Sequence, residues 1–82
     1  MADNKRILEA KDNLELIILI AKDYADRGLT QEELTEVGKD GIAKAREHYK
    51  ANQNFGFQAY AVWWIRQAML QAIAERGWLR ES

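Results

Sequence analysis

The sequence predicts an all-α fold, a compact domain of three helices, from three observations. The 82 residues contain no proline and are rich in Ala, Leu, Glu, Lys and Arg, which favour helix most strongly. Apolar residues recur at intervals of three and four, and no stretch alternates apolar and polar residues as a half-buried strand would. Capping residues and glycines stand where helices would begin and end. The length leaves room for one domain, which we assign to residues 1–82.

The first helix is expected from about Asn4 to Arg27. A helix that is apolar over more than half of its circumference needs neighbours on two sides, so we expect it at the centre of the domain. Gly28 follows at a position where a left-handed cap favours glycine. The apolar stripe of this helix comprises Leu14, Ile17, Ile18, Ala21, Tyr24 and Ala25, widened by Leu16 and Ile20.

The second helix is expected to begin after Thr30, because Thr30 and Glu33 have the spacing of a capping box. It continues to about Lys50. Gly38 and Gly41 each cost about 1 kcal/mol relative to alanine inside a helix, so they indicate a close helix contact or a bend. Residues 52–56 contain amides and a glycine without periodicity and are expected to form a loop.

The third helix, from about residue 57 or 58 to Arg76 with Gly77 as its cap, has two faces that differ in kind. Because adjacent residues lie about 100° apart on a helix, at least one of Trp63 and Trp64 is expected to be partly exposed. From the residues alone, these tryptophans are either core or part of a binding surface. One face is a packing stripe of Ala61, Ile65, Ala68, Met69, Ala72 and Ile73, and the other carries Tyr60, Trp63, Trp64, Gln67, Leu70 and Gln71. The expected core includes Leu14, Ile17, Ala21, Leu34, Ile42, Ile65, Ala68 and Ala72.

Composition argues against several classes of function. A net charge of -1 and a pI near 5.8 argue against a free-standing binder of duplex DNA. With no cysteine and one histidine, we predict no metal site and no cofactor. His48 has no nucleophile or ligand paired with it, and Glu32 and Glu33 fit helix capping better than acid-base chemistry, so we predict no catalytic residue and no enzyme. The longest apolar run, 16–21, is too short to span a membrane, and without a signal segment the cytoplasm is expected.

A resemblance to a known family begins at residues 60–68, Tyr-Ala-Val-Trp-Trp-Ile-Arg-Gln-Ala. This string resembles region 2 of the bacterial primary (housekeeping) sigma factors, the RNA polymerase subunits that recognise promoters. Residues 13–24 and 27–29 are similar to the first conserved helix of that region. A weaker similarity covers Leu34, Gly38, Gly41, Ile42, Lys44 and Ala45 in the second. The resemblance spans about residues 13–76.

The resemblance implies that the second helix docks on the clamp coiled coil of RNA polymerase core. It also implies that the last helix captures single-stranded non-template promoter DNA, with bases flipped out, in recognition and melting of the minus-ten element during transcription initiation. Aromatic stacking is worth about 1 to 3 kcal/mol per base, which gives the aromatic face a role. The implied DNA-binding residues are Asn13, Leu16, Tyr49, Phe55, Phe57, Tyr60, Trp63, Trp64, Arg66 and Gln67. The implied polymerase-binding residues are Leu14, Ile17, Glu33, Glu36, Val37 and Lys39.

Departures from the family pattern leave an alternative open. The pattern Asp-Leu-Ile-Gln-Glu-Gly-Asn becomes residues 33–39 here, so a glutamine, a glutamate and an asparagine of the polymerase contact are Glu36, Val37 and Lys39. Gln67 matches a family glutamine that reads the upstream base pair of the element, and Leu70 replaces a small hydroxyl residue that usually joins it in base reading. Basic and acidic residues that the family has beside the flipped-base pocket appear here as Lys50, Asn52 and Gln53, and a basic residue between two aromatics is Gly56. The alternative is a sigma-like interaction module that keeps the fold but has exchanged polymerase or DNA contacts for another protein partner, such as an anti-sigma factor. A purely structural bundle explains the periodicities but not the aromatic string.

Overall fold

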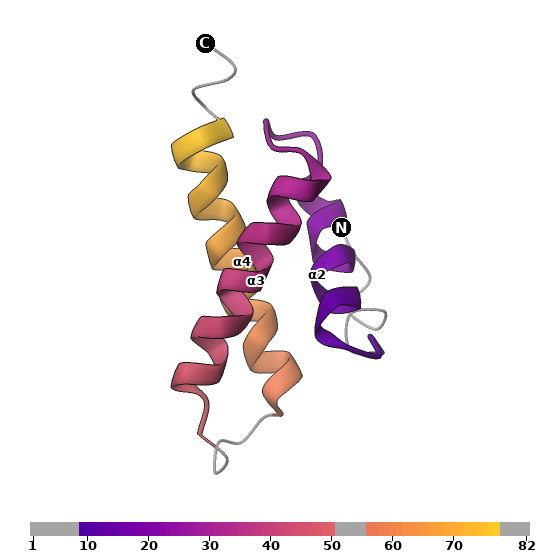
Figure 1. Ribbon diagram of the computed structural model, residues 1–82, viewed down its shortest axis with the longest axis vertical. Coiled ribbons are helices and arrows are strands. Elements are labelled where there is room, and N and C mark those ends of the chain that lie inside the picture. Colours follow the sequence, from indigo (N-terminus) through magenta and orange to yellow (C-terminus); the bar gives the residue numbers. More distant parts are fainter. Residues whose placement is uncertain (1–8, 51–55, 78–82) are drawn as a thin grey trace.

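The fold is a bundle of helices (Figure 1). The computed structural model describes residues 9–50 and 56–77. In chain order the elements are α2 (Asn13–Ala21), the 3-10 turn η1 (Lys22–Tyr24), α3 (Gln31–His48), α4 (Phe57–Ala72) and the π-helical turn η2 (Ile73–Gly77). No strand occurs in these two ranges, and the all-α prediction is confirmed.

The first helix is shorter than predicted because Asp12 caps it. The Asp12 carboxylate accepts a hydrogen bond from the backbone N–H of Glu15 at 2.8 Å, and residues 9–12 are not helical. Asp12, as the N-cap residue, has an extended backbone, so the helix does not continue beyond it toward the N-terminus. The predicted start near residue 4 lies outside the described residues, but a continuous helix from there to Arg27 is wrong. Gly28 does have a left-handed backbone, with a φ of 101°, in the turn that follows η1.

The capping box predicted for the second helix is confirmed. The Thr30 hydroxyl accepts from the backbone N–H of Glu33 at 3.1 Å, and the Glu33 carboxylate accepts from the backbone N–H of Thr30 at 2.9 Å. The helix ends at His48, two residues before the predicted end, because Tyr49 turns to an extended backbone.

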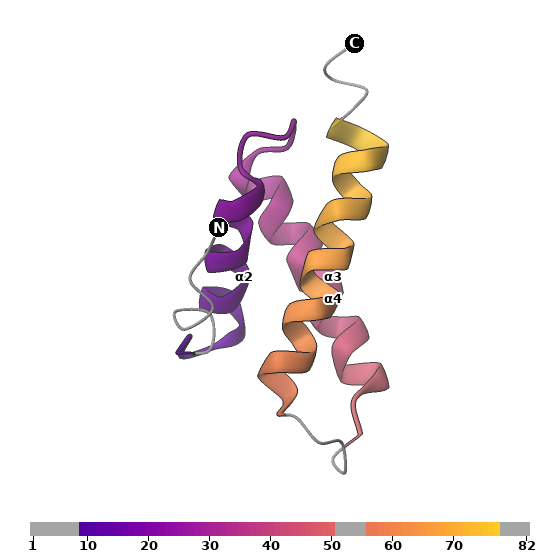
Figure 2. The ribbon, with the colours of Figure 1, turned by 180° about the vertical axis from the view of Figure 1, so that it is seen from behind.

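Two glycines bring α3 against both of its neighbours. A Cβ on Gly38 would collide with the side chain of Ile17 on α2. A Cβ on Gly41 would lie 2.8 Å from the Cα of Ile65 on α4. The predicted close contact is therefore confirmed, and it occurs on two sides. α3, rather than the first helix, has the extensive contacts with both other helices, as the views from the front and from behind show (Figures 1 and 2).

The hydrophobic core lies where these helices meet, and two expected members are placed differently. Leu14 is 50% exposed, because α2 buries the face of Leu16, Ile17 and Ile20 instead. Ala68 is half-buried at the edge of the contact between α3 and α4. Those of the expected core that the structure buries are Ile17, Ala21, Leu34, Ile42, Ile65 and Ala72.

Candidate nucleic-acid interface

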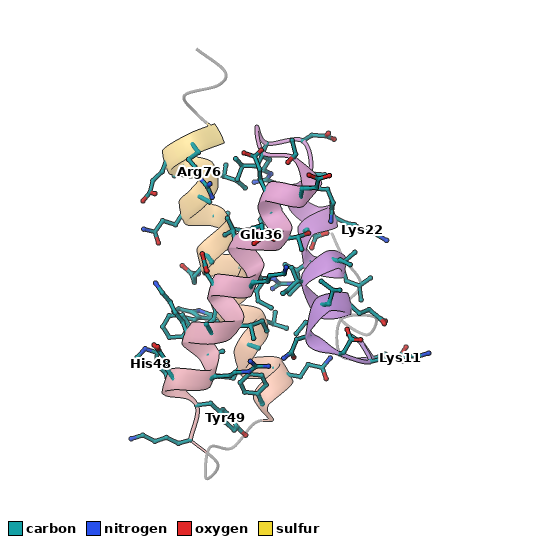
Figure 3. The ribbon with its side chains drawn as sticks, viewed as in Figure 1. Lys11, Lys22, Glu36, His48, Tyr49 and Arg76 are labelled. Carbon is teal, nitrogen blue, oxygen red and sulfur yellow. The ribbon has the colours of Figure 1, made fainter. Side chains whose placement is uncertain are left out.

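Aromatic side chains gather where α3 ends and α4 begins. His48 and Tyr49 lie at the end of α3 and point to different sides of it, as their labels show (Figure 3). The first turns of α4 supply the other rings, because Phe57, Tyr60 and Trp64 are spaced three and four residues apart. We call His48, Tyr49, Phe57, Tyr60, Trp63 and Trp64 the aromatic cluster.

The rings of the aromatic cluster form a continuous series of contacts. The Tyr49 ring meets Phe57 edge to face, with centroids 5.4 Å apart, and lies 5.6 Å from the Tyr60 ring. Tyr60 lies 6.3 Å from Trp64. Trp63 and Trp64 stand at 89° to each other with centroids 5.2 Å apart. Since aromatic pairs of this geometry contribute about 0.5 to 1.5 kcal/mol each beyond area burial, the cluster holds its own arrangement.

The two tryptophans differ in exposure. Trp64 is half-buried and packs against the core, as Phe57 and Tyr60 do. Trp63 is 55% exposed. One of the pair is thus structural and the other presents an indole to solvent, as expected from their 100° separation.

The outer face of α4 combines this exposed indole with an amide. Tyr60, Trp63 and Gln67 are spaced three and four residues apart and therefore line one side of α4, on which Trp63 and Gln67 are exposed and Tyr60 is half-buried at the border with the core. Arg66 is half-buried and lies on the flank of the helix opposite Trp64, about 200° around the axis. Phe55, the remaining aromatic predicted for this surface, lies outside the described residues.

A separate pocket of about 230 Å³ opens between α2 and α3. Ile17 and Ile42 form its apolar floor, and Lys39 and Arg46 contribute two cationic side chains. Its other lining residues are Asn13, Leu14 and Ala43. No residue of the aromatic cluster lines it.

Comparisons with known proteins identify the family. Residues 10–79 match the family model described as Sigma-70 region 2. The chain belongs to the sigma-70 region 2 family. It is 44% identical over 72 residues to the RNA polymerase sigma factor SigA of a Bacillus species, covering 88% of this chain and 19% of that protein. It is 45% identical over 67 residues to SigA of Listeria monocytogenes, covering 82% of this chain and 18% of that protein, and the SigA of Listeria innocua matches equally well. The chain thus spans about a fifth of the length of these relatives.

The structure separates the DNA-binding residues implied by sigma region 2 into two places. Six of the ten lie on α4, and a seventh, Tyr49, directly follows the end of α3 and contacts the rings of α4. Asn13 is half-buried in the α2–α3 pocket. Leu16 is 1% exposed inside the core, so its side chain does not face solvent in this structure, and its contact with a base stays a prediction.

The polymerase-binding residues implied by the family also divide. Leu14 and Lys39 are exposed at the α2–α3 pocket, whose floor includes Ile17, itself 2% exposed. Glu33 is used in the capping box. Glu36 accepts a hydrogen bond from Lys39 Nζ at 3.2 Å, so these two side chains form a salt bridge on the surface of α3.

Val37 is placed on a different side of α3 from the rest of that set. It is 8% exposed and faces Ala68 and Ala72 of α4. Its side chain is thus used inside the domain, and a contact of Val37 with the polymerase stays a prediction. The change from the family glutamate to valine at this position fits an apolar contact inside the domain.

Sequence reasoning missed one member of the site. His48 was set aside because no nucleophile or metal ligand accompanies it, yet its ring stacks on Trp64 with centroids 5.0 Å apart. Its spacing of seven residues from Gly41 places both on the face of α3 that meets α4, but the alignment of the two helices is what brings the imidazole onto Trp64. The described residues contain no group of three or more His, Cys, Asp or Glu side chains that could hold a metal ion. In the same residues no helix has the length and apolar character needed to cross a membrane.

Proposed function

We propose that this chain is a sigma-factor domain that acts with RNA polymerase core in transcription initiation and captures the unpaired non-template strand of the minus-ten promoter element. Its family and the SigA relatives support the role in initiation. The observation that carries the DNA contact is Trp63, an indole 55% exposed on the face of α4 that also carries Tyr60 and Gln67. The role is one of binding rather than catalysis, and it belongs in the cytoplasm with the polymerase.

Physical chemistry favours a single strand over a duplex at this surface. Unpaired bases offer ring faces that base pairing and stacking hide, and stacking on an aromatic side chain is worth about 1 to 3 kcal/mol per base. Of the described basic residues, Lys50 directly follows Tyr49 and Arg66 lies two residues beyond Trp64 on α4, and we count these two as the candidate phosphate contacts. With about 0.7 counterions released per single-strand phosphate contact, the salt dependence of binding should be shallow, near one or two ions.

Gln67 is the residue proposed to read a base. A side-chain amide can pair in bidentate fashion with the edge of an adenine. Gln67 lies one helical turn beyond Trp63 on the same face, so an indole and an amide are offered together. We assign to it the upstream base pair of the element.

Binding of labelled oligonucleotides tests this function. A single-stranded minus-ten non-template oligonucleotide should bind more tightly than the matched duplex. Trp63→Ala and Tyr60→Ala should each weaken single-strand binding about five- to 150-fold, the equivalent of one lost stack. Gln67→Ala should chiefly relax the preference for the upstream base pair, measured with polymerase present. Gln31→Ala, exposed in the first turn of α3, is the matched control and should bind like the parent.

Two results would contradict the proposal. Tighter binding to the duplex would mean that a basic or groove-reading surface dominates. Trp63→Ala and Tyr60→Ala proteins that bind the single strand like the parent would mean that the outer face of α4 is not the contact.

A second function is favoured by the α2–α3 pocket. An apolar floor with Lys39 and Arg46 beside it, next to the exposed Leu14, is a surface that suits a protein partner. Co-purification with RNA polymerase core, with and without promoter DNA, distinguishes a sigma-factor domain that binds polymerase from a sigma-like interaction module that does not. The double variant Glu36→Gln with Lys39→Asn should strengthen binding to the clamp coiled coil if the family interface is retained. Unchanged affinity would favour the sigma-like interaction module with another protein partner.

A further inference from the structure

Small residues on α3 bring its last turn against α4. A Cβ on Gly41 would lie 2.9 Å from the carbonyl oxygen of Trp64 and 2.8 Å from the Cα of Ile65. The backbone of α4 therefore occupies the space that a side chain at position 41 of α3 would need. Ala45, one turn later, is fully buried. His48 follows on the same face, because residues 41, 45 and 48 are spaced four and three apart. The imidazole is therefore carried to the edge of this contact, within reach of the Trp64 indole.

The His48 ring covers one face of Trp64. The two planes are inclined by only 8° with centroids 5.0 Å apart, the geometry of an offset stack. The other ring contacts of Trp64 are different in kind, since Trp63 stands at 89° to it and Tyr60 at 68°. The Trp64 Nε1 is buried and has no hydrogen-bond partner within the described residues. Trp64 is thus occupied on one face and closed at its polar edge.

Trp63 has the opposite character. It is the exposed ring of the pair, and within the described part of the chain its ring contact with the aromatic cluster is the edge-to-face one with Trp64. Any force that turns the Trp64 indole therefore also changes the support of Trp63.

From these contacts we propose that His48 is a positioning residue of the aromatic cluster. Its ring closes the face of Trp64 to DNA and holds that indole as the support of Trp63, so that bases stack on Trp63 and Tyr60 rather than on Trp64. The part that concerns DNA rests on the proposed function, whereas the support of Trp64 by His48 does not. Trp64 is accordingly removed from the DNA-contacting residues that the family resemblance implies.

The first test uses the protein without DNA. The ring-proton resonances of Trp64, assigned with Trp63→Phe and Trp64→Phe proteins, are compared in the parent, His48→Ala and Glu47→Ala. Glu47 is exposed in the same turn of α3 and serves as the matched control. His48→Ala should shift the Trp64 resonances, because the ring current of the imidazole is lost, and Glu47→Ala should not. Unchanged Trp64 resonances in His48→Ala would overturn the proposal.

The second test measures affinity for a fluorescein-labelled single-stranded minus-ten oligonucleotide at a temperature at which every variant is folded by circular dichroism. His48→Ala should bind about three- to tenfold more weakly, the range expected for one aromatic contact. His48→Phe, which keeps a flat ring, should stay within about twofold of the parent, as should Glu47→Ala. A His48→Ala protein that binds as tightly as the parent, or more tightly because Trp64 is uncovered, would overturn the proposal, as would equal weakening in His48→Phe. If the parent bound no single strand, the proposed function would fail, and the resonances of Trp64 would still decide the role of His48.

Discussion

The close approach of α3 and α4 at Gly41 makes Gly41→Ala a demanding test of the fold. The added Cβ would lie 2.8 Å from the Cα of Ile65 and 2.9 Å from the carbonyl oxygen of Trp64, both of which are backbone atoms of α4. Carbon atoms in favourable contact are about 3.5 to 4.0 Å apart, so α4 would have to move away by roughly 1 Å. No rotation of a side chain can relieve this contact.

The magnitude follows from two opposing effects. Overpacking a well-packed contact costs typically about 1 to 3 kcal/mol, and a clash with backbone belongs at the upper end of that range. Alanine regains about 1 kcal/mol of helix propensity relative to glycine. We therefore expect a net loss of about 2 kcal/mol in the free energy of unfolding, which lowers the Tm of a domain of this size by roughly 8 to 16 °C.

Thermal and urea unfolding followed by far-ultraviolet circular dichroism would measure the change. Gly56→Ala is the matched control, because a Cβ there would meet nothing within 4 Å and its φ of -72° suits alanine. It should change the free energy of unfolding by less than about 0.5 kcal/mol. A Gly41→Ala protein at least as stable as the parent would refute the reasoning, since propensity would then outweigh the contact.

Three other predictions concern the core, the helix cap and the contact between α3 and α4, and urea unfolding tests each of them. Ile65→Ala should lower the free energy of unfolding by about 2 to 5 kcal/mol through the cavity it leaves. Leu14→Ala, at an exposed position, should lower it by less than about 1 kcal/mol. Equal losses in the two variants would contradict the assignment of Ile65 to the core and Leu14 to the surface. Thr30→Ala should cost about 1 kcal/mol by removing the capping hydroxyl, and no loss would mean that water replaces the cap fully. Val37→Glu should destabilise the domain by about 2 to 4 kcal/mol, because it places a carboxylate against Ala68 and Ala72. A Val37→Glu protein as stable as the parent would contradict the burial of Val37.

Local signals explain which parts of the fold could be predicted from the sequence. The capping box of Thr30 and Glu33 involves residues three apart, and the structure reproduces it. The start of the first helix was misplaced although a local signal was present, since Asp12 stands three residues before Glu15 and caps it. The buried face of that helix carries no such signal, because residues 14 and 16–20 are all apolar and every face of the helix is a candidate. Which face is buried depends on where α3 approaches, and Leu14 lies away from it.

The candidate site shows the same division. The string around Trp63 and Trp64 indicated the family and also predicted that one of the two indoles is exposed. Both inferences need only residues within two to three turns of one helix. The stack of His48 on Trp64 depends on how α3 and α4 are aligned, which no periodicity within either helix determines. The burial of Val37 against α4 was missed for the same reason, because a change from a family pattern shows that a residue differs but not which way it faces.

The unequal contacts of the three helices have a consequence for local unfolding. α3 and α4 share the most extensive interface, while the nine residues of α2 pack chiefly on α3. Elements with less buried apolar contact open at a lower free energy than the whole domain, in cooperative units. The α3–α4 hairpin should therefore be the unit that opens last, with α2 able to detach and re-form upon it. The pocket between α2 and α3, and with it the exposed Leu14, then belongs to the least stable seam of the domain, whereas the aromatic cluster belongs to the most stable one.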